Sequence, residues 1–78
     1  MREVTLYTKS GCCLCDEAKA QIRAARERVE FAFREVDIEA DPALFEKHRT
    51  DIPVVEVDGR RAFKYRLTAG QLVARLRR

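Results

Sequence analysis

The sequence predicts an α/β domain with the element order β-α-β-α-β-β-α. Runs of β-branched and aromatic residues alternate along the chain with runs whose apolar residues recur at steps of three and four. An Asp-Gly pair at positions 58 and 59 predicts a hairpin between the last two strands. A chain of 78 residues can build only one core, so we expect a single domain over residues 1–78.

The first half of the chain predicts two parallel strands joined by a helix. Residues 4–8 alternate in the manner of a strand and stop at a turn formed by residues 9–11. Between about residues 13 and 28 the apolar side chains fall on one helical face. Residues 31–37 form the second strand, and the helical crossover between the two strands makes them parallel.

The second half predicts a short helix, a hairpin and a final helix. Asp41 followed by Pro42 is a helix-start signal, so a helix is expected over residues 43–48. Residues 52–57 form a third strand with Pro53 near its start, where a missing N–H costs least. A fourth strand over residues 61–65 pairs with it in an antiparallel manner in the same sheet. A capping box from Thr68 to Gln71 begins the last helix.

Composition restricts the class of protein. The chain is 46% hydrophobic and 37% charged, which is too apolar for a disordered tail and too charged for a membrane span. Its net charge is +3, and positively and negatively charged residues are interleaved along the chain. A nucleic-acid partner is therefore not required. Met1-Arg2-Glu3 runs directly into a strand without an apolar signal segment. We expect a cytoplasmic monomer with no membrane partner.

The aromatic residues and the single histidine receive structural interpretations. His48 lies among charged neighbours on the short helix and is expected to be solvated. Six aromatic residues fall at element positions that should bury them as core or sheet cover: Tyr7, Phe31, Phe33, Phe45, Phe63 and Tyr65.

Three cysteines lie within four residues of one another, and the chain has no others. Cys12, Cys13 and Cys15 therefore cannot staple distant parts of the fold, and any function of their thiols is local. In a reducing compartment, such a cluster is more often redox-active or metal-binding than structural.

Cys12 and Cys15 are predicted to form a redox pair. At a helix N-terminus their spacing brings both side chains to one face, within reach of a disulfide, and the free backbone N–H groups there favour a thiolate. Cys12 is nearest the helix end and should be the nucleophile. Cys15 should be the resolving thiol, because it lies one turn inside and beside Asp16 and Glu17. Lys9 could add positive charge near the thiolate, or it could be a solvated surface lysine.

Two other interpretations of the cluster remain open. The three thiols could bind Cu(I), zinc or an Fe–S cluster shared between two chains, or they could be inert in an interaction domain. Cys13 points away from the pair and could be a packed thiol without function, a spare thiol or a second resolver. A vicinal Cys12–Cys13 disulfide is disfavoured by its strained geometry.

The sequence resembles the glutaredoxin and thioredoxin superfamily, and within it the small bacterial glutaredoxin-like proteins. The segments that carry this resemblance are Tyr7-Thr8-Lys9-Ser10-Gly11-Cys12-Cys13-Leu14-Cys15, Ile52-Pro53-Val54-Val55 and Asp58-Gly59. The resemblance implies a thioredoxin-like fold with a four-stranded mixed sheet flanked by helices, and a thiol-disulfide oxidoreductase active in cell redox homeostasis. It also implies that Cys12 is the nucleophile and Cys15 the resolver.

The same resemblance implies the substrate-binding residues. Lys9 matches the lysine before the motif. Pro53 matches a cis-proline beside the cysteines, which would expose the backbone of Ile52 for pairing with an extended substrate. Substrates would be disulfide-containing proteins or small molecules, reduced at the expense of glutathione or a donor of the thioredoxin-reductase type.

The chain departs from the pattern of glutathione-using members at three places. Cys13-Leu14 replaces a Pro-aromatic pair, Asp51 replaces a threonine two residues before the cis-proline, and residues 63–66 replace a Gly-Gly with its acidic pair. We therefore expect no resident cofactor or metal. Glutathione would act as a co-substrate at most, with Arg60, Lys64 or Arg66 meeting its carboxylates.

Overall fold

The computed structural model describes residues 2–77. The expectation about a signal segment includes Met1, and this residue lies outside the described residues. The elements are β1 (Glu3–Thr8), α1 (Cys13–Arg26), β2 (Ala32–Asp37), the 3₁₀ turn η1 (Ile38–Ala40), α2 (Pro42–His48), β3 (Val54–Val57), β4 (Arg60–Lys64) and α3 (Ala69–Leu76). No helix in this part of the chain is long and apolar enough to cross a membrane.

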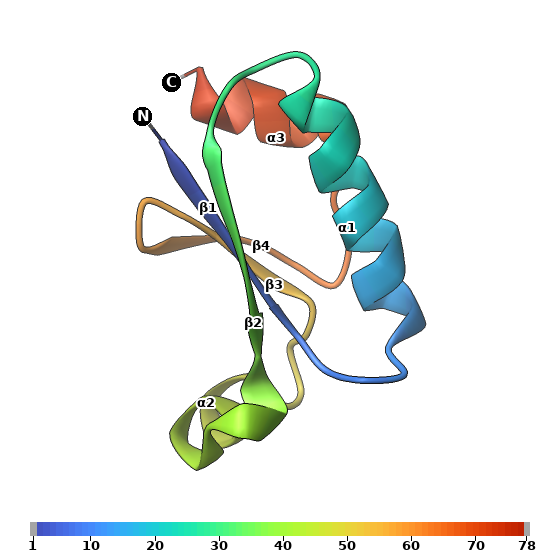
Figure 1. The fold of residues 1–78 in the computed structure, drawn as a ribbon, viewed down its shortest axis with the longest axis vertical. Coiled ribbons are helices and arrows are strands. Elements are labelled where there is room, and N and C mark those ends of the chain that lie inside the picture. The colour runs from blue at the N-terminus through green and yellow to red at the C-terminus, as the bar shows by residue number, and fades with distance from the viewer. Residues whose placement is uncertain (1, 78) are drawn as a thin grey trace.

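The four strands form one mixed sheet in the order β2-β1-β3-β4. β1 and β2 are parallel, whereas β3 is antiparallel to both β1 and β4. The predicted element order, the parallel pair and the hairpin in the same sheet are therefore confirmed. Figure 1 shows α1 and α3 lying together beside the sheet, with α2 at the far end of β2.

The main core lies between the sheet and the helices α1 and α3. Val4 and Leu6 of β1 are fully buried there against Ile22 of α1 and Leu72 of α3. The helix face predicted from apolar spacing is thus the buried one. Thr68 caps α3 through the predicted capping box, because its side chain accepts from the Gln71 N–H while the Gln71 side chain accepts from the Thr68 N–H.

Element boundaries differ from the predicted ones where backbone groups find other partners. α1 ends at Arg26, not at residue 28, because the N–H groups of Glu27 and Arg28 turn back to the carbonyls of Ala24 and Ala25. β3 begins at Val54, so Pro53 precedes the strand, since it has no N–H to donate to a ladder.

Two expectations about exposure are wrong. Tyr65 is 43% exposed, because β4 ends at Lys64 and the chain turns out of the sheet there. His48 is only 1% exposed, since the last residue of α2 faces the sheet and its ring stacks on Tyr7 at 4.5 Å between centroids. The other aromatics behave as expected: Phe31 is fully buried, and Phe33, Phe45, Phe63 and Tyr7 are partly buried.

The burial of His48 has an energetic cost. Neither ring nitrogen has a hydrogen-bond partner in the structure, and a buried polar atom without a partner is destabilising. Burial lowers the pKa of His48 from its ordinary value of 6.5, and the nearby charge of Lys47 acts in the same direction. The folded protein therefore holds His48 neutral where the unfolded chain would protonate it.

His48→Phe should raise the free energy of unfolding by about 1 kcal/mol, because phenylalanine keeps the stacked ring and removes the two unpartnered nitrogens. Urea unfolding at about pH 7.5 and about pH 5.5 measures it. A lowered folded-state pKa gives stability that is present above the unfolded value and lost as the pH falls. The parent should lose stability over this range, and the variant should lose less. Equal losses would contradict this account of the chain's only histidine.

Candidate redox site

Cys12 forms the N-terminal cap of α1. Its backbone is extended, with φ of −91° and ψ of 110°, and its sulfur accepts a hydrogen bond from the backbone N–H of Cys15 at 3.2 Å. The Cys12 carbonyl accepts from the N–H of Asp16 at 3.3 Å and so begins the helical hydrogen-bond pattern. The sulfur therefore lies at the positive end of the helix dipole, where a cap residue is normally an oxygen acceptor.

The three thiols differ in exposure. Cys15 is 2% exposed, Cys12 is partly buried and Cys13 is exposed to solvent. All three are free thiols in the structure. The spacing of the pair thus brings Cys12 and Cys15 together at one end of α1, while Cys13 faces away from them as expected.

Burial controls the protonation of Cys15. Loss of solvation raises the pKa of the Cys15 thiol, and its hydrogen bond with Cys12 acts in the same direction. Hydrogen bonds from the Thr8 side chain and the Lys9 backbone oppose the rise in pKa. Asp16 and Glu17, which the sequence suggested as the cause, are both exposed, and burial is the largest cause instead. The Cys15 thiol is therefore protonated at neutral pH and lies buried beside Cys12.

The segment before β3 lies against the same cysteines. The Ile52–Pro53 peptide bond is cis, as the resemblance implied. Ile52 is 8% exposed and shares a small buried cluster with Cys15 and Ile38, against which Cys12 also packs. Within residues 2–77, the backbone N–H and C=O of Ile52 make no hydrogen bond. Neither group therefore has a hydrogen-bond partner in this part of the chain.

Lys9 lies apart from the two sulfurs in the present arrangement. Its side chain is exposed directly after β1 and forms no ion pair among the described residues. It borders a polar pocket of about 350 Å³ together with Ser10, Gly11 and Asp16. Its backbone, by contrast, contacts the Cys15 sulfur.

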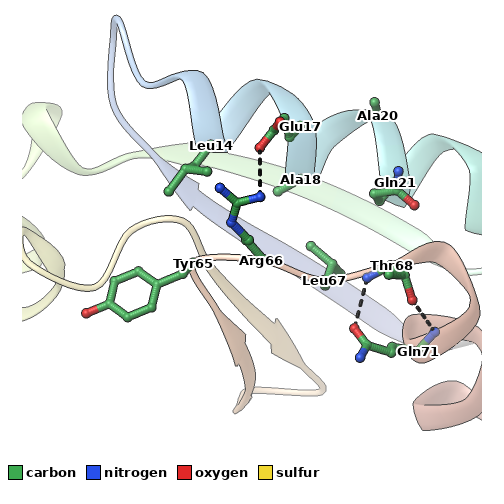
Figure 2. Close-up of a pocket in the computed structure, with 10 residues that line it drawn as sticks. All are labelled: Leu14, Glu17, Ala18, Ala20, Gln21, Tyr65, Arg66, Leu67, Thr68 and Gln71. Carbon is green, nitrogen blue, oxygen red and sulfur yellow. Dashed lines mark hydrogen bonds and ion pairs between the residues drawn. The ribbon is translucent and has the colours of Figure 1, made fainter.

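A second pocket, which was not predicted from the sequence, is lined by Leu14 of the cysteine motif. Its volume is about 500 Å³, and it separates α1 from the connection between β4 and α3. Figure 2 shows Leu14 and Tyr65 at one end, Thr68 and Gln71 at the other, and Arg66 reaching across to Glu17. The nitrogen and oxygen of that pair are 4.0 Å apart. Leu14, an apolar residue inside the cysteine motif, was the signal for it.

The residues suggested for glutathione fall at different distances from this pocket. Arg66 lines it, and the ammonium of Lys64 lies 5.4 Å from the centre of the Tyr65 ring at its edge. Arg60 begins β4 at the hairpin end, where it pairs with Val57. Within residues 2–77, no three His, Cys, Asp or Glu side chains are placed to hold one metal ion.

Comparison with known proteins agrees with this arrangement. Residues 3–77 match the family described as Glutaredoxin-like domain (DUF836). The Glutaredoxin-like protein YDR286C homolog of Dictyostelium discoideum is 33% identical to this chain, over 88% of this chain and 69% of the relative. Both matches cover the cysteine motif and the segment of Pro53.

Solved structures show the same fold. The X-ray structure of target protein XcR50 from X. campestris is 32% identical, with a TM-score of 0.80 and 95% of each chain covered. Thioredoxin-2 of the malaria parasite covers 99% of this chain and 82% of its own at a TM-score of 0.74, and at 12% identity it shows the fold alone. The structure is thus a thioredoxin fold, and the chain belongs to the family of glutaredoxin-like proteins of the thioredoxin superfamily.

Proposed function

We propose that the protein is a thiol-disulfide oxidoreductase in which Cys12 is the nucleophile and Cys15 the resolving thiol. The observation that carries the proposal is the hydrogen bond from the Cys15 N–H to the Cys12 sulfur at the start of α1, with the Cys15 thiol buried directly behind it. This arrangement gives one accessible sulfur in a site that stabilises negative charge. It also keeps the second sulfur close and protonated until it is needed.

The reaction has two exchange steps. The Cys12 thiolate attacks one sulfur of a substrate disulfide, forms a mixed disulfide and releases the other half as a thiolate, which takes up a proton. Cys15 then loses its proton and attacks the Cys12 sulfur, which releases the second half as a thiol. The substrate gains two electrons, and the protein becomes the Cys12–Cys15 disulfide. A thiol or dithiol donor returns both electrons in the reverse sequence.

The substrate would be a disulfide-bearing protein or small molecule in the cytoplasm. Ile52 supports a polypeptide substrate, because its free backbone groups lie beside Cys12 and can pair with an extended chain. Glutathione or a donor of the thioredoxin-reductase type would supply the electrons. Lys9 would act on approaching substrates as an exposed charge, since it does not contact the sulfurs.

No observation favours the alternative of a metal or Fe–S site on the three cysteines. Cys13 is exposed to solvent, whereas Cys15 is buried. Among the residues that the structure describes, the three sulfurs do not converge on one point with any fourth ligand.

Replacing each cysteine by serine tests the assignment of roles. With a dithiol reductant in excess, Cys12→Ser should reduce turnover of a protein disulfide to the uncatalysed rate, because the attacking thiolate is gone. Cys15→Ser should accumulate the mixed disulfide on Cys12 and turn over only as fast as the external dithiol resolves it. Cys13→Ser is the matched control and should keep nearly the parent rate. Full turnover by Cys12→Ser would remove the proposed nucleophile.

Alkylation tests the difference in exposure. In three proteins that each retain one cysteine, iodoacetamide should modify Cys15 the most slowly at neutral pH, because its thiol is buried and its pKa is raised. The rate for Cys15 should increase steeply as the pH becomes alkaline and the thiol ionises. Mass spectrometry at timed intervals gives the three rates. A Cys15 that reacted as fast as the exposed Cys13 would show that the thiol is not shielded.

A further inference from the structure

Tyr65 has a backbone conformation that its residue type disfavours. Its φ is 66°, and the other described non-glycine residue at positive φ, Asp58, belongs to the Asp-Gly hairpin turn. Asp tolerates this left-handed region, whereas a bulky side chain there is strained. Such a conformation persists only where surrounding contacts hold it, and it is found preferentially at functional sites.

Burial does not hold Tyr65 in place. Among residues 2–77, Tyr65 is the one large hydrophobic residue that is exposed to solvent, at 43%. Figure 2 shows its ring at the same end of the pocket as Leu14, which lies across the pocket from it. The hydroxyl points away from α1. The hydrophobic effect would favour a conformation that buried this ring.

Hydrogen bonds to the segment of Thr50–Pro53 hold Tyr65 instead. The Tyr65 N–H donates to the Pro53 carbonyl at 2.8 Å. The hydroxyl donates to the Thr50 carbonyl at 3.1 Å and lies 3.5 Å from a carboxylate oxygen of Asp51. Tyr65 thus forms hydrogen bonds with both ends of the segment 50–53, and Ile52 lies between the two contacts.

The other polar contacts of this segment are made by Asp51. The Asp51 N–H donates to the His48 carbonyl at 2.9 Å, and the Asp51 carboxylate pairs with Arg61 at 3.3 Å. No helix or strand includes residues 50–53. The Ile52 side chain is held by the buried cluster with Cys15 and Ile38, and Tyr65 holds the backbone on either side of it through Thr50 and Pro53.

We infer that Tyr65 is a positioning residue that holds the free N–H and C=O of Ile52 where an extended polypeptide substrate pairs with them. This inference rests on the proposed function. It assigns Tyr65 no contact with the reacting sulfurs. Its strained backbone is retained because a relaxed residue 65 would release the segment that binds the substrate chain.

Two disulfide probes with the same leaving group separate this role from a general structural one. The first is a short extended peptide whose cysteine carries a 2-hydroxyethyl mixed disulfide, and the second is bis(2-hydroxyethyl) disulfide, which has no backbone to pair. Single turnovers of prereduced protein give a half-saturating concentration and a limiting rate for each probe without any assumption about the donor.

Tyr65→Phe should raise the half-saturating concentration for the peptide by about two- to tenfold, the equivalent of one lost hydrogen bond. Its limiting rate and both constants for the small probe should stay at parent values. Tyr7→Phe is the matched control, because it removes the other tyrosine hydroxyl, which donates to Glu56 on β3 at 3.2 Å. The control should leave the ratio of the half-saturating concentrations of the two probes unchanged.

Two further variants guard against a trivial loss of folding. Arg61→Gln removes the exposed ion pair with Asp51. It should raise the half-saturating concentration for the peptide by less than Tyr65→Phe does, and circular dichroism checks that the variant is folded. Tyr65→Gly relieves the backbone strain and should still bind the peptide more weakly than the parent. Equal effects of Tyr65→Phe on both probes, or no effect on either, would overturn the inference. A parent protein inert to both probes would instead overturn the proposed function.

Discussion

The structure depends on a sulfur atom that serves as a helix cap. The first N–H groups of any helix need acceptors outside the helix. In α1 the Cys12 sulfur takes the N–H of Cys15, while the chain enters from β1 through the turn at Gly11, whose φ of 74° suits glycine. Because the cap is the Cys12 sulfur, the turn that starts the helix also places this sulfur at the positive end of the helix dipole. Folding of α1 and formation of the site are one event.

The main core and the smaller buried cluster serve different purposes. α1 and α3 bury the main core on one face, which fixes the end of α1 relative to the strands. The smaller cluster around Cys15, Ile38 and Ile52 joins the redox pair to the segment before β3. α2 packs its buried His48 on Tyr7. The core therefore supplies most of the hydrophobic stabilisation, and the smaller cluster sets the positions of the sulfurs and of Ile52.

Much of this arrangement could be predicted from residue patterns, because local rules decided it. Apolar spacing located α1, the Asp-Gly pair located the hairpin, and the capping box located α3. The place of Cys12 and Cys15 at a strand-to-helix turn was also predictable, and the roles proposed for them rest on that place. Three features could not be found in this way, since they depend on tertiary contacts. His48 is buried although its neighbours in sequence are charged, Tyr65 is exposed although it is aromatic, and the burial of Cys15 outweighs the acidic residues that follow it.

The central claim is that Cys12 alone attacks the substrate and Cys15 alone releases it. The most direct measurement is to mix Cys15→Ser protein with a protein disulfide, quench with acid and locate the adduct by fragmentation mass spectrometry. The account predicts a stable mixed disulfide on Cys12, with Cys13 still a free thiol. An adduct on Cys13, or rapid release of the adduct without Cys15, would contradict it.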